Sequence, residues 1–402
     1  MSDLDRCVDL LRRLIRTPSM PGREGDLADI VADEMRGLGY DEVTVDRMGN
    51  VIGRVEGRGE APPVMFNTHL DHVDVGDESK WAQAPFGGDV VDGKVWGRGA
   101  VDIKGPLAAQ VHGVARLVGA PERPPGDVWV TCVVQEEIGG VGARHLRDHL
   151  WVPLVVIGEP SSNTLRRGHR GRIVRLPPAA GRALHPCGPQ TGVPPLESLA
   201  RFVLALGAVE HPVDDVLGPS SVGLTLLRTD QSSPNVTPGE IWQTLDWRSV
   251  RGQSGPQAQA ALERVLEGSL GEGATAEITI PVFPHHTYTG ERMDIPGSNP
   301  AYALADDHPA LVAACDVLEE LTGAAPSPGV WKFATDGGHF AETGMAPIGI
   351  GPGDEFLAHT NREHIEIAAL EEALAINEAL ARGLPARAAD LWERNGGVPE
   401  PT

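Results

Sequence analysis

Residues 63–71 read Pro-Val-Met-Phe-Asn-Thr-His-Leu-Asp, and this stretch decides the fold. Its first part, residues 64–66, is a short apolar run that is typical of a buried strand. Its second part places a histidine and an acid just past that strand. Ligands and metals in α/β proteins bind at the carboxyl ends of the strands. The stretch therefore predicts a sheet whose strand ends carry the chemistry.

The segments around this stretch alternate between strand and helix patterns. Residues 128–134 and 154–157 are unbroken apolar runs, which is typical of strands that are buried on both faces. Helical spacing of apolar residues recurs at 4–16, 24–38, 104–117, 309–321 and 367–380. Strands that alternate with helices predict an α/β domain with a mostly parallel sheet flanked by helices.

A second unit interrupts this alternation. The chain has 402 residues, and a single hydrophobic core stops growing near about 250–300 residues, so we expect two domains. After Glu159 the pattern changes to a compact mixture of strands and helices, which predicts an inserted, smaller α+β lid domain. We expect the lid to span residues 168–283 and the catalytic domain to be built from 1–167 and 284–402.

Bulk properties exclude some partners. The formal net charge of −22 argues against a nucleic-acid partner, because phosphate binding needs a basic face. No apolar run of about 18 residues is present, so we expect no membrane span. The start of the chain lacks the apolar core of a signal peptide. Four scattered cysteines without a Cys-x-x-Cys pair indicate free thiols in a reducing cytoplasm: Cys7, Cys132, Cys187 and Cys315.

His69 and Asp71 are two residues apart, so on an extended backbone their side chains point the same way. A metal-bound imidazole usually donates its second N–H to such a carboxylate. We therefore expect His69 to bind a metal ion and Asp71 to orient it. The alternative is a polar strand end with a solvated pair.

Asp102 lies in the glycine-rich segment 97–105, where the backbone can approach a crowded site. An aspartate that bridges two cations would suit such a packed turn. A helix N-cap before Lys104 explains the same spacing, and that alternative stays open.

Glu136 and Glu137 follow a buried strand directly, and Glu159 follows another. Neighbouring strand residues face opposite ways, so both acids of the pair reach one site only if the backbone is irregular at 138–140. Two solvated acids before a helix are the alternative. A carboxylate at the end of a buried strand, such as Glu159, needs a cation or a hydrogen-bond partner.

His359 lies in the glycine-rich loop 351–360. Our hypothesis is that five side chains hold two divalent metal ions and that Glu136 works beside them as the acid–base group. The five are His69, Asp102, Glu137, Glu159 and His359.

These motifs resemble a known family. His-x-Asp, Gly-Arg-Gly-x-x-Asp-x-Lys-Gly, Glu-Glu-x-Gly-Gly, Gly-Glu-Pro and Ala-His-Thr occur in this order over nearly the whole chain. They are similar to zinc metallopeptidase family 20, which includes acetylornithine deacetylase, succinyl-diaminopimelate desuccinylase and glutamate carboxypeptidase. The resemblance implies that Asp102 bridges two zinc ions. It also implies that His69 and Glu159 complete one site, and that Glu137 and His359 complete the other.

The resemblance extends to the lid and to the base. Glu136 resembles the general base of the family. His185 looks like the lid histidine that reaches the active site of a dimer partner. Asn235 and Arg248 match lid positions that grip a substrate carboxylate or oxyanion. These likenesses imply a homodimer formed through the lid.

The function implied is a dinuclear metal-dependent hydrolase that cleaves an amide bond of an N-acyl amino acid or a similar small substrate with a carboxylate. A dipeptidase or carboxypeptidase with the same site is the alternative, and a catalytically silent metal-binding relative is a further one. Three carboxylates and two imidazoles suit zinc, and cobalt or manganese is compatible with the same donors.

Overall fold

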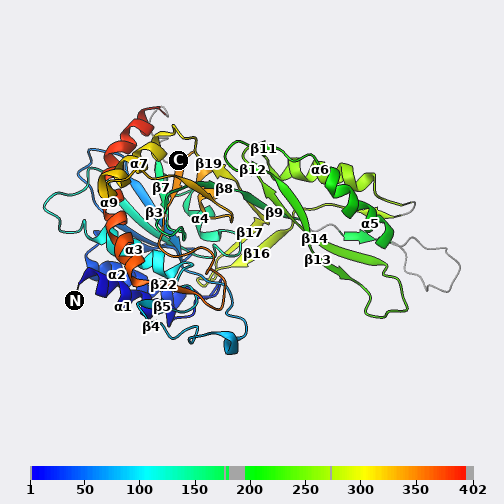
Figure 1. The fold of residues 1–402 in the computed structure, drawn as a ribbon, viewed down its shortest axis with the longest axis horizontal. Helices are drawn as coiled ribbons and strands as arrows, with labels where there is room; N and C mark the ends of the chain where they lie inside the picture. Colours follow the sequence, from blue (N-terminus) through cyan, green and yellow to red (C-terminus); the bar gives the residue numbers. More distant parts are fainter. Residues whose placement is uncertain (1, 176–177, 181–194, 272–273, 395–402) are drawn as a thin grey trace.

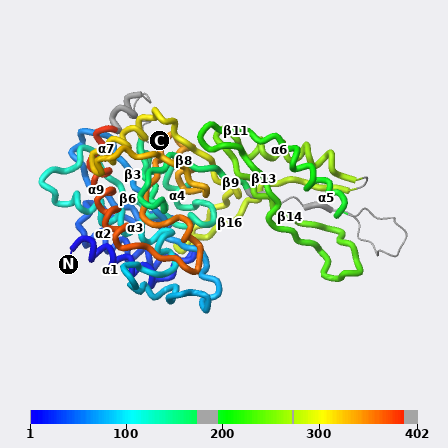
Figure 2. Tube along the Cα trace, viewed as in Figure 1, coloured from blue at the N-terminus to red at the C-terminus, as the bar shows by residue number. Residues whose placement is uncertain are grey.

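A computed structural model of the chain describes residues 2–175, 178–180, 195–271 and 274–394. One large sheet with its helices forms the body at the left of Figure 1, and a smaller sheet with two helices extends to the right. Figure 2 shows that the blue start and the red end of the chain lie in the same body, with the green lid between them in sequence. Within the described ranges, no helix is both long enough and apolar enough to cross a membrane.

The main sheet confirms the predicted α/β class. Its described strands pair in the order β1 (Glu42–Val45), β2 (Val51–Val55), β6 (Val128–Val133), β3 (Val64–His69), β7 (Leu154–Ile157), β21 (Ala346–Gly349), β8 (Arg166–His169) and β19 (Tyr302–Ala303), with β20 (Gly329–Trp331) beside β8. The centre of the sheet is parallel, because β3 pairs in parallel with β6 and β7, and β7 pairs in parallel with β21. The carboxyl ends of these four strands therefore meet at one edge.

Successive side chains of the central strands point to opposite faces of the sheet, so the strands need an apolar partner on each face. Helices cover both faces. Val64 and Phe66 pack with one group of helices, and Met65 between them packs on the other face. Full burial of a side chain such as Phe66 contributes about 1.5–3 kcal/mol. The first face carries α1 (Asp3–Ile15), α2 (Gly25–Leu38), α3 (Lys104–Ala115), α7 (Pro309–Thr322) and α9 (Ile367–Arg394). The second face carries α4 (Val141–Leu146) and α8 (Gly337–Ala341).

The lid has an antiparallel sheet and a core of its own. Its strands are β9 (Gly171–Arg175), β10 (Pro178–Ala180), β13 (Ser221–Thr229), β14 (Glu240–Ser249), β15 (Thr275–Ala276) and β18 (Ser298–Asn299), and its helices are α5 (Pro195–Ala205) and α6 (Gly255–Glu267). Leu245 and Trp247 of β14 are buried in a core with residues of both helices. The alternate residues, Asp246 and Arg248, therefore lie on the opposite face of the lid sheet.

The strand pairing crosses the predicted lid limits. His169, inside the predicted range 168–283, pairs in the main sheet through β8, whereas β18 lies beyond that range and pairs with β9 of the lid. The domain limits themselves stay a prediction.

Smaller elements complete the described chain. They are β4 (Asp89–Val91), β5 (Lys94–Trp96), β22 (His364–Glu366), β11 (Val213–Asp214), β12 (Gly218–Pro219), the hairpin of β16 (Val282–His286) and β17 (Arg292–Pro296), and the 3-10 turns Glu78–Lys80 and Leu206–Ala208.

Two elements differ from the sequence-based expectation. Strands β16 and β17 form a hairpin that the sequence periodicities do not indicate, and Pro284 is accommodated within this two-stranded ribbon. Helix α9 continues past residue 380 and through Pro385. Leu380 and Leu384 are fully buried there, so packing outweighs the helix-breaking tendency of Gly383 and Pro385.

Candidate active site

The structure gathers the five candidate metal ligands at the carboxyl edge of the main sheet. His69 is the last residue of β3, Glu137 follows β6, and Glu159 follows β7. His359 lies in the loop after β21, and Asp102 lies just before α3. Neighbouring parallel strands end at the same edge, which explains why residues so far apart in sequence meet.

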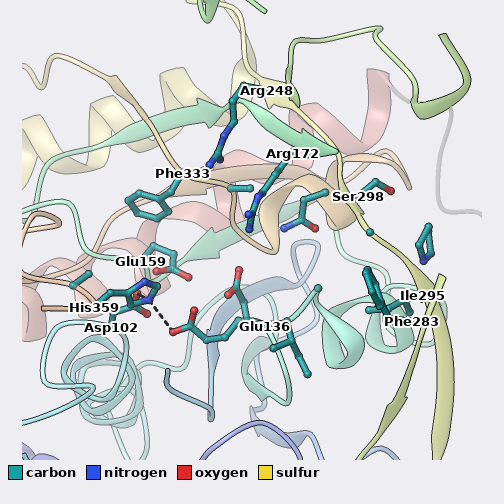
Figure 3. A pocket seen from close by; sticks show the side chains of 18 of the residues that line it. Asp102, Glu136, Glu159, Arg172, Arg248, Phe283, Ile295, Ser298, Phe333 and His359 are labelled. Atoms are coloured by element: carbon teal, nitrogen blue, oxygen red, sulfur yellow. Dashed lines mark hydrogen bonds and ion pairs between the residues drawn. The ribbon is translucent and has the colours of Figure 1, made fainter. Parts of the chain in front are cut away.

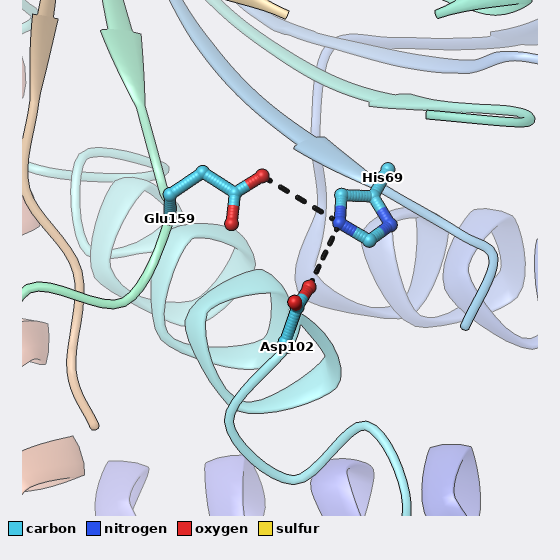
Figure 4. Close-up of side chains that lie close together, drawn as sticks. All are labelled: His69, Asp102 and Glu159. Atoms are coloured by element: carbon cyan, nitrogen blue, oxygen red, sulfur yellow. Dashed lines mark hydrogen bonds and ion pairs between the residues drawn. The ribbon is translucent and has the colours of Figure 1, made fainter. Parts of the chain in front are cut away.

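The first group consists of His69, Asp102 and Glu159 (Figure 4). His69 Nε2 lies 3.1 Å from Asp102 Oδ1 and 3.6 Å from Glu159 Oε1. The exposed fractions of the His69 and Glu159 side chains are 2% and 6%. One nitrogen and two carboxylate oxygens thus converge in a place that water barely reaches.

The second group consists of Asp102, Glu137 and His359. His359 Nε2 lies 3.0 Å from Asp102 Oδ2 and 3.0 Å from Glu137 Oε1. Asp102 therefore offers one carboxylate oxygen to each group, which is the geometry that a bridging ligand needs. The N-cap alternative for Asp102 is wrong, because α3 has Ile103 at its N-cap position and no side-chain cap.

The charges of this cluster fit a pair of cations. Burial and the neighbouring Asp102 raise the pKa of Glu137 to about 7 and the pKa of Glu159 well above its usual range. Hydrogen bonds to Asp102 and Glu137 raise the pKa of His359 to about 10. Burial alone would lower the pKa of His69, but the carboxylates of Asp102 and Asp71 raise it well above its usual value. Buried acids with raised pKa values lose their protons when metal ions bind, because the cations stabilise the buried carboxylate charges.

Glu136 lies beside the two groups, and the backbone on both sides of it is irregular. Gln135 has a φ of 56° and Gly140 a φ of 73°, both in the left-handed region. This irregular backbone allows Glu136 and Glu137 to line the same cavity, so the alternative of two solvated acids is wrong. Burial and the negative charge of Asp336 raise the pKa of Glu136 well above its usual range.

Asp71 is fully buried and binds the backbone that carries this acid pair. Its Oδ1 accepts the N–H of Glu136 at 3.0 Å, and its Oδ2 accepts the N–H of Glu137 at 3.1 Å. His69 Nδ1 lies 3.0 Å from the backbone oxygen of Asp71 and 3.4 Å from its carboxylate. The expected contact between the two side chains is therefore present, but the backbone oxygen is the closer partner of the histidine.

The groups open into a cavity of about 460 Å³ between the body and the lid (Figure 3). Arg248 lines it, as expected of a group that binds substrate. Asn235 does not line it, because this residue is exposed in the loop between β13 and β14. In Figure 1 that loop lies at the end of the lid away from the body. His185 lies outside the described residues. Within the described chain, Asn235 therefore lies away from the cavity that Arg248 lines.

Comparison with known proteins gives the family. The family model of Peptidase family M20/M25/M40 matches residues 65–383, which is most of the chain. The chain belongs to this family. Succinyl-diaminopimelate desuccinylase of Cereibacter sphaeroides is 28% identical over 386 residues, which cover 92% of this chain and 96% of that protein.

Solved structures show the same fold as this M20 family member. A tripeptidase of Staphylococcus aureus has a TM-score of 0.75 at 20% identity, with 96% of this chain and 99% of that chain covered. A dinuclear metal-binding M20 peptidase of Bacillus subtilis has a TM-score of 0.71 at 16% identity, with 96% and 99% covered. The expected family and fold class are thereby confirmed, and the chain is a metallohydrolase of the M20 family that acts on amide or peptide bonds.

Sequence reasoning missed two groups of residues in this M20 site. Glu363 is fully buried, and its Oε1 accepts the N–H of Val101 and of Asp102 at 3.0 and 3.1 Å. Its other oxygen binds Arg98 at 2.6 Å, so this pair fixes the turn that presents Asp102. Arg172 lines the cavity beside Arg248. No local pattern marks either group, because strand pairing and packing over long range place them.

Metal binding by this M20 protein at pH 7 should release at least one proton per chain. With a pKa of about 10, metal-free His359 is protonated at pH 7, and a metal ion at Nε2 displaces that proton. Affinity should therefore fall as the pH falls below 10, by about tenfold per pH unit for each proton displaced. Calorimetry in buffers of different ionisation enthalpy measures this number. His364→Gln, outside both groups, should release as many protons as the unaltered chain, and a buffer-independent enthalpy would contradict the assignment.

Replacing Asp71 by asparagine should lower kcat by about 10-fold to 100-fold, the usual effect of losing a partner that orients metal ligands. The amide group keeps one acceptor, but its NH₂ would face one of the N–H groups of Glu136 and Glu137. Steady-state kinetics beside a metal analysis measures the effect. Asp74→Asn, at a nearby exposed position, is the control and should have normal kcat. Equal rates in the two variants would show that Asp71 has no positioning role.

Proposed function

We propose that this protein is a dinuclear metal-dependent hydrolase that cleaves the amide bond of an N-acyl amino acid or a similar small carboxylate substrate. The observation that carries the proposal is the shared position of Asp102 between two ligand groups, with Glu136 in the same cavity. Arg248 lines that cavity and provides a positive group for a carboxylate.

The ligands divide into two sites in this proposal. His69 and Glu159 would hold one ion, Glu137 and His359 would hold the other, and Asp102 would contribute one carboxylate oxygen to each. Nitrogen and carboxylate donors of this kind suit zinc, with cobalt or manganese as compatible ions. Bound there, two divalent ions would polarise a substrate carbonyl and lower the pKa of water.

The residues of the chain perform the proton transfers and the positioning. Glu136 accepts the proton that the attacking water loses, and it later donates that proton to the leaving amine. The breaking C–N bond thereby yields a carboxylate and a free amine. Asp71 holds the backbone of Glu136, and Arg248 binds the carboxylate of the substrate.

A peptidase is the second candidate, because a dipeptide also offers an amide bond close to a carboxylate. The cavity of about 460 Å³ lies within the usual range of small-molecule sites, about 300–1,000 Å³, and has room for either substrate. The desuccinylase relative favours acyl transfer to water from an N-acylated amine, and we rank that reaction first.

A screen of the zinc-loaded protein tests the proposal. The panel contains N-acetyl and N-succinyl amino acids beside dipeptides, and release of free amine is the readout. Turnover that depends on added metal supports a hydrolase, and the better class of substrate separates deacylase from dipeptidase. Bound metal without turnover on any member would instead favour a catalytically silent relative.

We also propose a homodimer formed through the lid. In the described part of the lid, β13 pairs only with β14, and its Leu224, Leu226 and Leu227 are 37%, 46% and 45% exposed. An exposed apolar edge strand is a template for pairing with another chain. A second lid could also bring its Asn235 to this cavity.

Leu226→Lys should convert the dimer into monomers, because a charge on the paired edge opposes association. Light scattering at micromolar concentration measures the mass. Val90→Lys, at a 45% exposed position of the body, is the control and should leave the dimer intact. A monomeric unaltered chain would rule out the dimer.

A further inference from the structure

The cavity has a basic end that the ligand groups do not explain. Arg172 on β9 and Arg248 on β14 are direct partners across the lid sheet, and both line the cavity. Figure 3 shows both side chains pointing from the lid toward Glu159 and Glu136. They are the only arginines or lysines among the described lining residues. Any anionic part of a substrate that stays away from the metal centre must therefore bind here.

Asp246 orients these two arginines and neutralises one of their charges. Its Oδ2 accepts from Arg172 Nε at 3.1 Å, and its Oδ1 lies 3.0 Å from Arg248 Nε. All three residues lie on the face of the lid sheet that is opposite to its helices. Two guanidinium groups and one carboxylate leave a net charge of +1, so a single substrate carboxylate balances the trio. Asp246 accepts from Arg172 Nε and from Arg248 Nη2, so the guanidinium N–H groups that do not face Asp246 can bind that carboxylate.

A different wall of the cavity is apolar. Phe283 and Ile295 are partners across the hairpin of β16 and β17, and Ile138 follows Glu137 directly. Phe283 and Ile138 are 39% and 43% exposed, although large apolar side chains are usually buried. A Cβ on Gly139 would lie 2.8 Å from Ile295, so glycine there allows this loop to pack against the hairpin. The wall thus adjoins the acid pair and has apolar surface that no described side chain covers.

We infer that the preferred substrate carries one carboxylate, bound by Arg172 together with Arg248, and one bulky apolar group that packs on Ile138 and Phe283. This inference rests on the proposed amide hydrolysis and names its substrate class. A second carboxylate is disfavoured, because one carboxylate already balances the net charge of +1, and the described lining residues outside the two ligand groups include no further cation. The substrate would therefore differ from the acidic acyl compound named in the desuccinylase relative.

Binding of the substrate carboxylate by Arg172 and Arg248 is tested with N-acetyl-L-phenylalanine and its carboxamide as a matched pair. The zinc-loaded chain should prefer the acid in kcat/KM, and Arg172→Gln should reduce that preference by about 10-fold to 100-fold, the usual effect of losing a charged hydrogen-bond donor. Arg264→Gln is the control, because Arg264 is exposed on α6 outside the cavity. An undiminished preference in Arg172→Gln would overturn the role of Arg172.

The apolar half is tested with two pairs: N-acetyl-L-phenylalanine against N-acetyl-L-aspartate, and N-benzoylglycine against N-succinylglycine. The apolar member of at least one pair should be preferred, and Phe283→Thr should reduce that preference by about tenfold, as expected for the loss of one phenyl contact. Val282→Thr is the matched control, because the neighbouring strand residue faces the other way. A preference for the acidic member in both pairs would overturn the apolar wall.

A binding measurement keeps this inference separate from the proposed reaction. Calorimetry on the zinc-loaded chain compares 3-phenylpropanoate, 3-phenylpropanamide and succinate. Tightest binding of 3-phenylpropanoate, weakened about tenfold or more in Arg172→Gln, supports the substrate class even if no amide is hydrolysed and the proposed function fails. Binding of succinate as tight as that of 3-phenylpropanoate, or binding that Arg172→Gln leaves intact, overturns the inference even if amide hydrolysis is established.

Discussion

Replacing Glu136 by glutamine lowers kcat by about 10²-fold to 10⁴-fold, the usual contribution of a positioned acid–base group. Glu136 lines the cavity beside Glu137 and Glu159 but belongs to neither ligand group. Glutamine has nearly the same shape and cannot carry the proton from water to the leaving amine. The variant should therefore still bind two metal ions and substrate.

Metal content and kcat measured on the same preparation check this result. Glu122→Gln, at a side chain that is 78% exposed, is the control for the loss of one acid and should have normal kcat. Full turnover in Glu136→Gln would remove Glu136 from the reaction. Loss of both metal and turnover would show that Glu136 acts on the ligands and not on the proton.

Replacing Asp102 by asparagine should leave no more than one metal ion per chain and lower kcat by about 10³-fold or more. Its two oxygens lie 3.1 Å from His69 Nε2 and 3.0 Å from His359 Nε2, so each group depends on one of them. Asparagine provides a single neutral oxygen and an NH₂ group that cannot bind metal. The loss of one ion removes several kcal/mol of charge stabilisation, which corresponds to about three orders of magnitude in rate.

Metal analysis after gel filtration in metal-free buffer measures the stoichiometry. Glu159→Gln is the comparison, because Glu159 belongs to the first group only, and it should keep the ion of the second group. Two ions and normal turnover in Asp102→Asn would show that this residue does not bridge.

Local sequence signals were sufficient for the residues at the strand ends. His69 and Glu159 follow apolar runs, and a fully buried run in an α/β pattern places the next polar residue at the ligand edge of the sheet. The main sheet and the helices on its two faces follow from the same periodicities. For Asp102, the spacing also fitted a helix cap. Only the approach of His69 and His359 distinguishes a bridging metal ligand from a cap.

The remaining features depend on contacts over long range. Glu363 meets Arg98 across 265 residues of sequence, and no periodicity connects them. Arg172 faces the cavity because β9 pairs with β14 in one register, and a shift of one residue would turn it toward the lid helices. Phe283 lies on a hairpin whose pairing no local pattern indicates. Local patterns therefore place the candidate ligands at the strand ends, whereas strand register and pairing place the residues of the proposed pocket.

Anomalous scattering from crystals of the zinc-loaded chain tests the central claim most directly. Two zinc peaks should appear about 3.5–4 Å apart, the usual spacing of two-metal sites. One peak should lie between His69 and Glu159, the other between Glu137 and His359, and Asp102 should touch both. A single peak, or two peaks that do not share Asp102, would contradict this claim.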